Sequence, residues 1–131
     1  MTAKKALVGV EPDELPTMSP DSLWVARELR PGIDWNKVMK EHGREPSKWF
    51  GAKMLHPDRP AFCITKTWIA PSTLYHWEKR FVSVREAQVL TGFPANYILP
   101  GAFKDRWARV GNSVAPPMSR EIVKQVLGRI G

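Results

Sequence analysis

The apolar positions of the chain fall in short groups separated by prolines, and the first group predicts a helix. It occupies residues 23–29 and follows Ser19-Pro20. A serine is a good helix N-cap, and proline is favoured at the first helical position. The helix is therefore expected to begin at Pro20 and to stop near Pro31-Gly32, where the chain cannot continue helically.

The next two apolar groups predict a short helix and a strand. Val38 and Met39 belong to the helix, which Asp34 would cap and Gly43 would end. Residues 61–68 are rich in β-branched and aromatic side chains that partly alternate, as in a strand. Two side chains would lie on one face and three on the other: Phe62 and Ile64 against Cys63, Thr65 and Thr67. Cys63 is then expected to be a buried structural thiol, and residues 74–81 to be a second extended piece.

A local signature fixes one further helix. Ser83 and Glu86 are spaced as a capping box, in which each side chain accepts a hydrogen bond from the other residue's backbone N–H. This helix should end at Gly92. Residues 96–109 are expected to be a loop with some helix at 104–108.

The last predicted element is an amphipathic helix after Gly111-Asn112-Ser113, with Pro116-Pro117 in its first turn. Asn112 and Ser113 are candidates for its N-cap. Its apolar residues lie on one broad face: Met118, Ile122, Val126 and Ile130, widened by Val123 and Leu127. An apolar stripe must be buried against something. That partner is either the body of this domain or another chain.

Composition and charge add a candidate partner. The 131 residues carry a net charge of +7, of which +6 lies in residues 66–131, with ten Lys/Arg and four Asp/Glu. A basic half suits a polyanion such as nucleic acid. A single cysteine excludes a disulfide framework, and no Cys/His spacing matches a metal site. The chain has no membrane-spanning run and no signal peptide, so we expect a cytoplasmic protein without a membrane partner.

Three segments, in this order, carry a resemblance to a known family. They are the run from Arg80 to Ala87 with Gly92-Phe93-Pro94, the run from Arg109 to Pro117, and His56–Ala61 with Ile64-Thr65. They resemble the ninth motif, the tenth motif and the end of the target-recognition region of the DNA cytosine-5 methyltransferases. The likeness covers about residues 54–127, with a looser match over 15–53.

The resemblance implies an α+β fold. A small irregular β-sheet with peripheral helices would form the target-recognition domain, and the C-terminal helix would pack on a missing α/β cofactor domain. The expected division is an N-terminal tail at 1–14, target recognition with the ninth motif at 15–110, and the tenth-motif loop and helix at 111–131.

The family transfers a methyl group from S-adenosylmethionine to carbon 5 of a flipped cytosine in DNA. This chain lacks the family's catalytic Pro-Cys, its Phe-x-Gly-x-Gly cofactor loop, and its Glu-Asn-Val and Arg-x-Arg segments. It is therefore expected to supply no catalytic residue and to be inactive alone. It would be a C-terminal fragment or small subunit that binds the cofactor only together with the missing domain.

Residue roles follow from the same resemblance. Asn112, Ser113 and Val114 match cofactor-contacting positions, and Thr65 matches a phosphate-contacting threonine. The full set of candidate DNA-binding residues is Thr65, Lys66, Lys79, Arg80, Arg85, Arg106 and Arg109. Double-stranded DNA and a chain carrying the catalytic domain are the expected partners, with self-association through the last helix. The alternatives are a non-catalytic DNA-binding module and the inactive remnant of a truncated gene.

Overall fold

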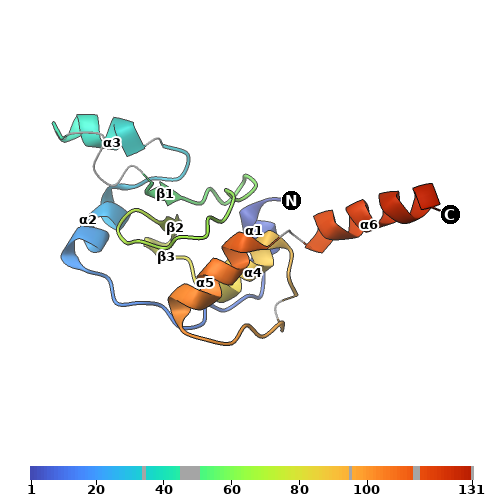
Figure 1. Cartoon of the computed structure of the whole chain (residues 1–131). Coiled ribbons are helices and arrows are strands. Elements are labelled where there is room, and N and C mark those ends of the chain that lie inside the picture. Colours follow the sequence, from blue (N-terminus) through green and yellow to red (C-terminus); the bar gives the residue numbers. More distant parts are fainter. Residues whose placement is uncertain (34, 45–50, 95, 114–115, 131) are drawn as a thin grey trace.

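The computed structural model describes residues 1–33, 35–44, 51–94, 96–113 and 116–130, and Figure 1 shows their arrangement. A small sheet lies among helices, so the expected α+β class is confirmed. The elements in chain order are α1 (Ala3–Ala6), α2 (Pro20–Glu28), α3 (Trp35–Glu41), β1 (Lys53–Met54), β2 (Leu74–His76), β3 (Arg80–Phe81), α4 (Val84–Thr91), α5 (Phe103–Asn112) and α6 (Pro116–Ile130).

The sheet has the order β1-β2-β3 and is mixed. β1 runs parallel to β2, with Lys53 beside Leu74. β3 runs antiparallel to β2, with His76 beside Arg80. The predicted extended piece at 74–81 is therefore a hairpin. Its turn is closed by a bond from the backbone N–H of Lys79 to the carbonyl of His76 (3.0 Å), and Lys79 has a left-handed φ of 66°.

The caps predicted for α2 and α4 are confirmed. The Ser19 hydroxyl accepts a hydrogen bond from the backbone N–H of Ser22, and α2 begins at Pro20. Ser83 and Glu86 form the complete capping box of α4, which ends at Gly92 in a left-handed conformation. Such caps depend on residues within one turn of each other, so the sequence specifies them directly. Asp34, the expected cap of α3, lies outside the described residues.

The core lies between α2, α3, the sheet and the pair α4–α5. Val25 of α2 and its C-cap residue Leu29 are buried, the central strand β2 contributes Tyr75, and the edge strand β3 contributes Phe81. α5 closes the core with Trp107 and Val110. Figure 1 shows α4 and α5 side by side, below the sheet in that view.

The predicted strand at 61–68 is wrong. Among the residues that the structure describes, the segment has no ladder partner, and Phe62 is 44% exposed. Its neighbour is helix α5 rather than a strand, since the Trp107 indole N–H binds the Thr65 carbonyl (3.0 Å). Cys63, expected to be buried, is exposed. The partial alternation of residues 61–68 therefore does not correspond to a strand in a sheet.

α5 is longer than expected and takes in part of the predicted loop before the last helix. It runs to Asn112, so Gly111 and Asn112 are helical. α6 follows the predicted boundaries and extends away from the rest of the chain in Figure 1. Its described apolar side chains are all at least half exposed: Met118, Ile122, Val123, Val126 and Leu127. Within the described parts of the chain, no helix combines the length and apolar character that crossing a membrane requires.

The first residues, expected as a tail, include α1. The backbone N–H of Ala3 donates to the carbonyl of Arg59 (2.8 Å), and that of Lys4 to the carbonyl of Pro57 (3.0 Å). Ala3 and Leu7 are buried. This segment is thus attached to the turn that precedes the loop at 61–68.

Candidate functional site

The loop carrying Thr65 and Lys66 lies directly on α5. Besides the bond from Trp107, the helix contacts the loop at Gly111, one turn further on. A Cβ at Gly111 would lie 2.5 Å from the backbone nitrogen of Lys66 and 2.6 Å from its Cα. Real side chains do not approach so closely, so only glycine fits at this position. Trp107 and Gly111, one turn apart on α5, thus hold the loop against the helix.

This contact brings two predicted groups together. Thr65 and Lys66, both exposed, were expected to touch DNA, and Asn112 and Ser113, which follow Gly111, were expected to touch the cofactor. The expectation that the latter pair caps α6 is wrong for Ser113. It is the C-cap of α5, and its hydroxyl donates to the Val110 carbonyl (2.7 Å). Asn112 is the exposed last residue of α5, because the helix continues past Gly111. Val114 lies outside the described residues.

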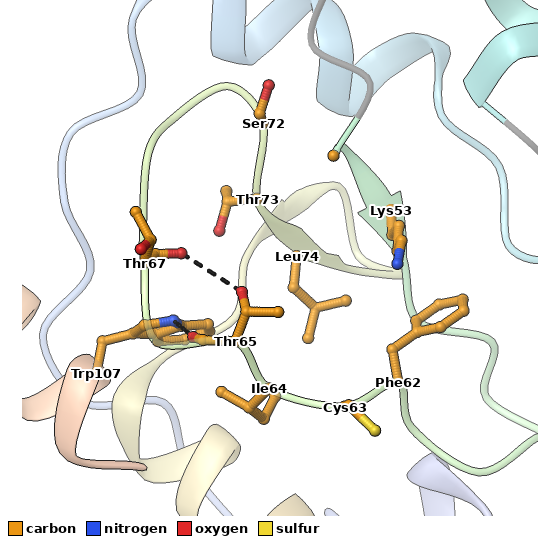
Figure 2. Close-up of a pocket in the computed structure, with 11 residues that line it drawn as sticks. Lys53, Phe62, Cys63, Ile64, Thr65, Thr67, Ser72, Thr73, Leu74 and Trp107 are labelled. Carbon is orange, nitrogen blue, oxygen red and sulfur yellow. Dashed lines mark hydrogen bonds between the residues drawn. The ribbon is translucent and has the colours of Figure 1, made fainter. Parts of the chain in front are cut away.

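A cavity of about 260 Å³ opens beside this loop, and Figure 2 shows its lining. Its polar lining consists of the Lys53 ammonium and the hydroxyls of Thr65, Thr67, Ser72 and Thr73. The Thr65 hydroxyl donates to the Thr67 carbonyl at the long distance of 3.5 Å. A second cavity, of about 280 Å³, is also lined by Cys63 and Ile64 of the loop and reaches Ser113.

Helix α4, in the run that resembles the ninth motif, begins at an ion pair whose carboxylate is buried. Arg80 donates to both oxygens of Glu86, at 2.7 and 2.9 Å, and the backbone N–H of Ser83 donates to one of them. Burial raises the pKa of the Glu86 carboxyl, but the hydrogen bonds from Arg80 and Ser83 outweigh this and lower it overall. Glu86 is therefore an anion that fixes Arg80 and the start of α4.

His76 lies beside this pair. It is 4% exposed, and its Nε2 is 3.7 Å from the Glu86 carboxylate. The backbone N–H of Glu78 donates to Nδ1 (3.0 Å), so Nδ1 carries no proton. Burial, together with the nearby Arg80 charge, lowers the pKa of His76. The imidazole is therefore neutral at physiological pH and packs on Trp77.

The Lys79 ammonium lies at the end of α2. It donates to the carbonyls of Arg27, in the last turn of that helix, and of Leu29, its C-cap. A cation at a helix C-terminus satisfies carbonyls that have no partner within the helix and complements the helix dipole. This predicted phosphate contact thus has a structural role in the free chain.

Two further arginines have partners inside the chain. Arg106 forms an ion pair with Asp13 (2.5 Å), and Asp13 also accepts from the backbone N–H of Arg85. Burial opposes ionisation of Asp13, but these hydrogen bonds lower its pKa overall. Arg109 donates to the Pro100 carbonyl. The Arg85 side chain is exposed.

The structure therefore divides the seven candidate DNA-binding residues. Lys66 and Arg85 are exposed cations with no ion-pair partner among the described residues, and Thr65 is also exposed. The side chains of four other cations contact groups of the chain: Lys79 and Arg109, which are exposed, and Arg80 and Arg106, which are half-buried. The sequence predicts base-reading residues in 37–53 or 72–79 without naming any, and it does not single out Lys53, which lies at the cavity beside Thr65. The available signal was weak, because residues 1–65 carry a net charge of only +1.

A family model described as C-5 cytosine-specific DNA methylase matches residues 25–128. The chain belongs to this family. Among the described residues, no group of three or more His, Cys, Asp or Glu side chains is placed to hold a metal ion.

Curated relatives agree with this family. The chain is 32% identical over 73 residues to the Type II methyltransferase M1.HphI of Haemophilus parahaemolyticus, covering 55% of this chain and 19% of that protein. It is 42% identical over 45 residues to the DNA (cytosine-5)-methyltransferase CMT2 of Oryza sativa subsp. japonica, covering 34% of this chain and 3% of the relative. A DNA (cytosine-5)-methyltransferase 1 of Gallus gallus is 38% identical over 58 residues, or 44% of this chain and 4% of the relative. The chain thus spans a fifth or less of these relatives, and no solved structure matches it significantly.

Proposed function

We propose that this chain is the C-terminal part of a DNA cytosine-5 methyltransferase and is not catalytic alone. It supplies DNA target recognition and completes the S-adenosylmethionine pocket of a separate catalytic domain. The observation that carries this proposal is the contact of Gly111 with the backbone of Thr65 and Lys66. This contact supports the proposal because the segment proposed to bind DNA then adjoins the segment proposed to bind the cofactor.

The DNA-binding part rests on exposed polar and basic groups. Thr65, Lys66 and Arg85 are available to phosphate oxygens, and Lys66 and Arg85 lie in the half of the chain that carries +6. Contacts of this kind give affinity and salt dependence, and they orient a protein on the duplex without reading its sequence.

The cofactor part rests on the end of α5. When bound, S-adenosylmethionine supplies the methyl group, and Asn112 and Ser113 would contact its methionine end. The Asn112 amide is exposed, and the Ser113 hydroxyl keeps acceptor capacity after donating to Val110. The neighbouring cavity of about 280 Å³ has an otherwise largely apolar lining, from Ala61, Ile64, Leu90 and Val110 among others. These residues fit one edge of a cofactor site whose other walls come from elsewhere.

The nucleophile must also come from elsewhere. Cys63, the single cysteine, follows Phe62 rather than proline and lies in an irregular loop. A second chain, or another part of a longer one, would carry Pro-Cys and Phe-x-Gly-x-Gly. The exposed apolar face of α6 is the surface that would pack on that domain, because such a face is costly to leave in water.

Co-purification tests this proposal. The chain is tagged and co-expressed with a polypeptide from the same genome that carries Pro-Cys and Phe-x-Gly-x-Gly. We expect a stoichiometric complex that shifts duplex DNA in a mobility assay. The double variant Ile122→Gln, Val126→Gln should lose the complex, since both side chains lie on the apolar face. The matched control, Arg120→Gln with Lys124→Gln on the polar face, should retain it.

The outcome separates the proposal from its main rival. An independent DNA-binding module would shift DNA alone and would not retain the catalytic polypeptide. Failure of the wild-type chain to form the complex, or equal behaviour of the two double variants, would contradict the proposal.

A further inference from the structure

Two cavities meet at a pair of side chains that the family resemblance does not assign. The cavity of Figure 2 and a neighbouring one of about 290 Å³ are both lined by Lys53 and Phe62. The second cavity extends past Arg59 to the turn at Gly32. The two cavities therefore adjoin at Lys53 and Phe62, and together they are called the groove.

The groove carries cations that the chain does not neutralise. Lys53 and Arg59 are exposed, and neither has an ion-pair partner within the described parts of the chain. The same holds for Lys66, at the other end of the loop. This separates them from Arg80 and Arg106, whose charges are matched by Glu86 and Asp13. The groove is thus a surface on which positive charge is available to an outside anion.

Phe62 fixes where one of these charges lies. Lys53 points outward because β1 alternates, with Met54 buried on the opposite face. Its ammonium is 5.3 Å from the centre of the Phe62 ring, within the range of a cation–π contact. The ring is 44% exposed. Figure 2 shows the two side chains next to each other at one side of the cavity. Phe62 therefore orients Lys53 without neutralising it.

The groove also contains hydroxyl groups that can donate hydrogen bonds to an anion. Hydroxyls of Thr65, Thr67 and Ser72 line the same cavity as Lys53. Hydroxyl groups and lysine ammoniums are the usual partners of phosphate oxygens in protein–DNA contacts. Such a set fits a phosphodiester better than an apolar ligand.

We propose that Lys53, positioned by Phe62, binds a phosphate of duplex DNA above this hydroxyl-lined cavity, and that the groove follows the DNA backbone toward Arg59. This inference deepens the proposed function and rests on it. Lys53 supplies the charge, and Phe62 is a positioning residue that does not itself need to contact the DNA.

Salt-dependent DNA binding tests the proposal. Fluorescence anisotropy of a labelled short duplex is measured with the full chain between about 50 and 200 mM salt. Lys53→Gln should weaken binding at least about threefold at low salt and should reduce the slope of log affinity against log salt by about 0.9, the value for one lost phosphate contact. Lys124→Gln on α6 removes the same charge away from the groove and should leave the slope unchanged.

The aromatic ring has its own test. Phe62→Leu should weaken DNA binding, as Lys53→Gln does. Phe62→Tyr keeps an aromatic ring beside the ammonium and should bind DNA like the wild type. In the Lys53→Gln background, Phe62→Leu should add nothing further.

Two results overturn the inference. If the chain binds DNA but Lys53→Gln and Lys124→Gln have equal slopes, Lys53 does not contact phosphate, and the proposed function stands. If the wild-type chain fails to bind duplex DNA both alone and with its catalytic partner, the proposed function and this inference fall together.

Discussion

Two basic residues at or next to motif positions make contacts that stabilise the fold of the chain itself. Arg80 belongs to the run that resembles the ninth methyltransferase motif, yet both of its terminal nitrogens bind Glu86. Lys79 likewise binds the carbonyls at the end of α2. The basic residues at the motif positions therefore divide into those that bind groups of the chain itself and those that remain available to an outside anion.

Removing the Glu86 charge should destabilise the fold. Glu86 is 1% exposed and accepts three hydrogen bonds, so Glu86→Gln leaves the half-buried Arg80 with only the exposed Glu78 as a counter-charge. Breaking such a pair from one side should cost about 2–3 kcal/mol in the free energy of unfolding. Urea denaturation measures this. Glu121→Gln, which removes an exposed partner of Lys124, should cost less than about 0.5 kcal/mol. Equal losses in the two variants would contradict the role assigned to Glu86.

Stability should fall as the pH is lowered, in two stages. Burial lowers the pKa of His76 below its usual 6.5, so the unfolded chain takes up this proton first, and stability declines from about pH 6.5 downward. The pKa of Glu86 lies below its usual 4.5, so its contribution is present above that pH and is lost as the pH falls through the folded value.

The charged groups facing His76 are Arg80, Glu86 and Glu78. Urea midpoints measured from pH 8 to pH 4 should therefore fall in wild type already below about pH 6.5. In His76→Gln the decline should begin only near the carboxylate range. Identical profiles between neutral pH and pH 5 would refute a neutral buried His76.

At the scale of elements, the decisive contact is the one between α5 and the loop at 61–67. Gly111→Ala would place a methyl group 2.5 Å from the Lys66 nitrogen, against backbone that cannot rotate away. We expect a loss of roughly 1–3 kcal/mol in the free energy of unfolding, the usual range for overpacking. DNA affinity should fall as well, because the loop carrying Thr65 is displaced.

Gly128→Ala is the matched control. Nothing lies within 4 Å of a Cβ at Gly128 in α6, so alanine should be neutral or slightly stabilising through its better helix propensity. Urea denaturation and duplex binding of both variants check this. If Gly111→Ala behaves like Gly128→Ala, the loop is not held by α5.

The same contact explains where sequence-based prediction stopped. The caps at Ser19 and Ser83 and the stop at Gly92 use neighbours along the chain, and all three were predicted. Residues 61–68 alternate partly as a strand does, but the Thr65 carbonyl binds the indole N–H of Trp107, 42 residues away. The Arg106 partner, Asp13, is 93 residues away. Contacts between residues so far apart produce no periodic pattern in the sequence, so the sequence predicts the candidate site only in part.

At the scale of the whole molecule, the distribution of surface chemistry fits a part that works with another. Positive charge remains available around Lys53 and Lys66, beside the loop held by α5. An apolar helix, α6, extends away from the rest of the chain in Figure 1. The chain also spans at most 19% of the curated relatives described above. A polar groove and an apolar arm suggest two different partners: DNA for the first and a protein domain for the second.

The most direct test of this account is transfer of a labelled methyl group from S-adenosylmethionine to cytosine in duplex DNA. It compares this chain alone, the polypeptide carrying Pro-Cys and Phe-x-Gly-x-Gly alone, and the two mixed in increasing ratio. We predict no 5-methylcytosine with either alone and activity that rises to a plateau at equal amounts of the two. Methylation by this chain alone, or a catalytic polypeptide whose activity does not change when this chain is added, would contradict the account.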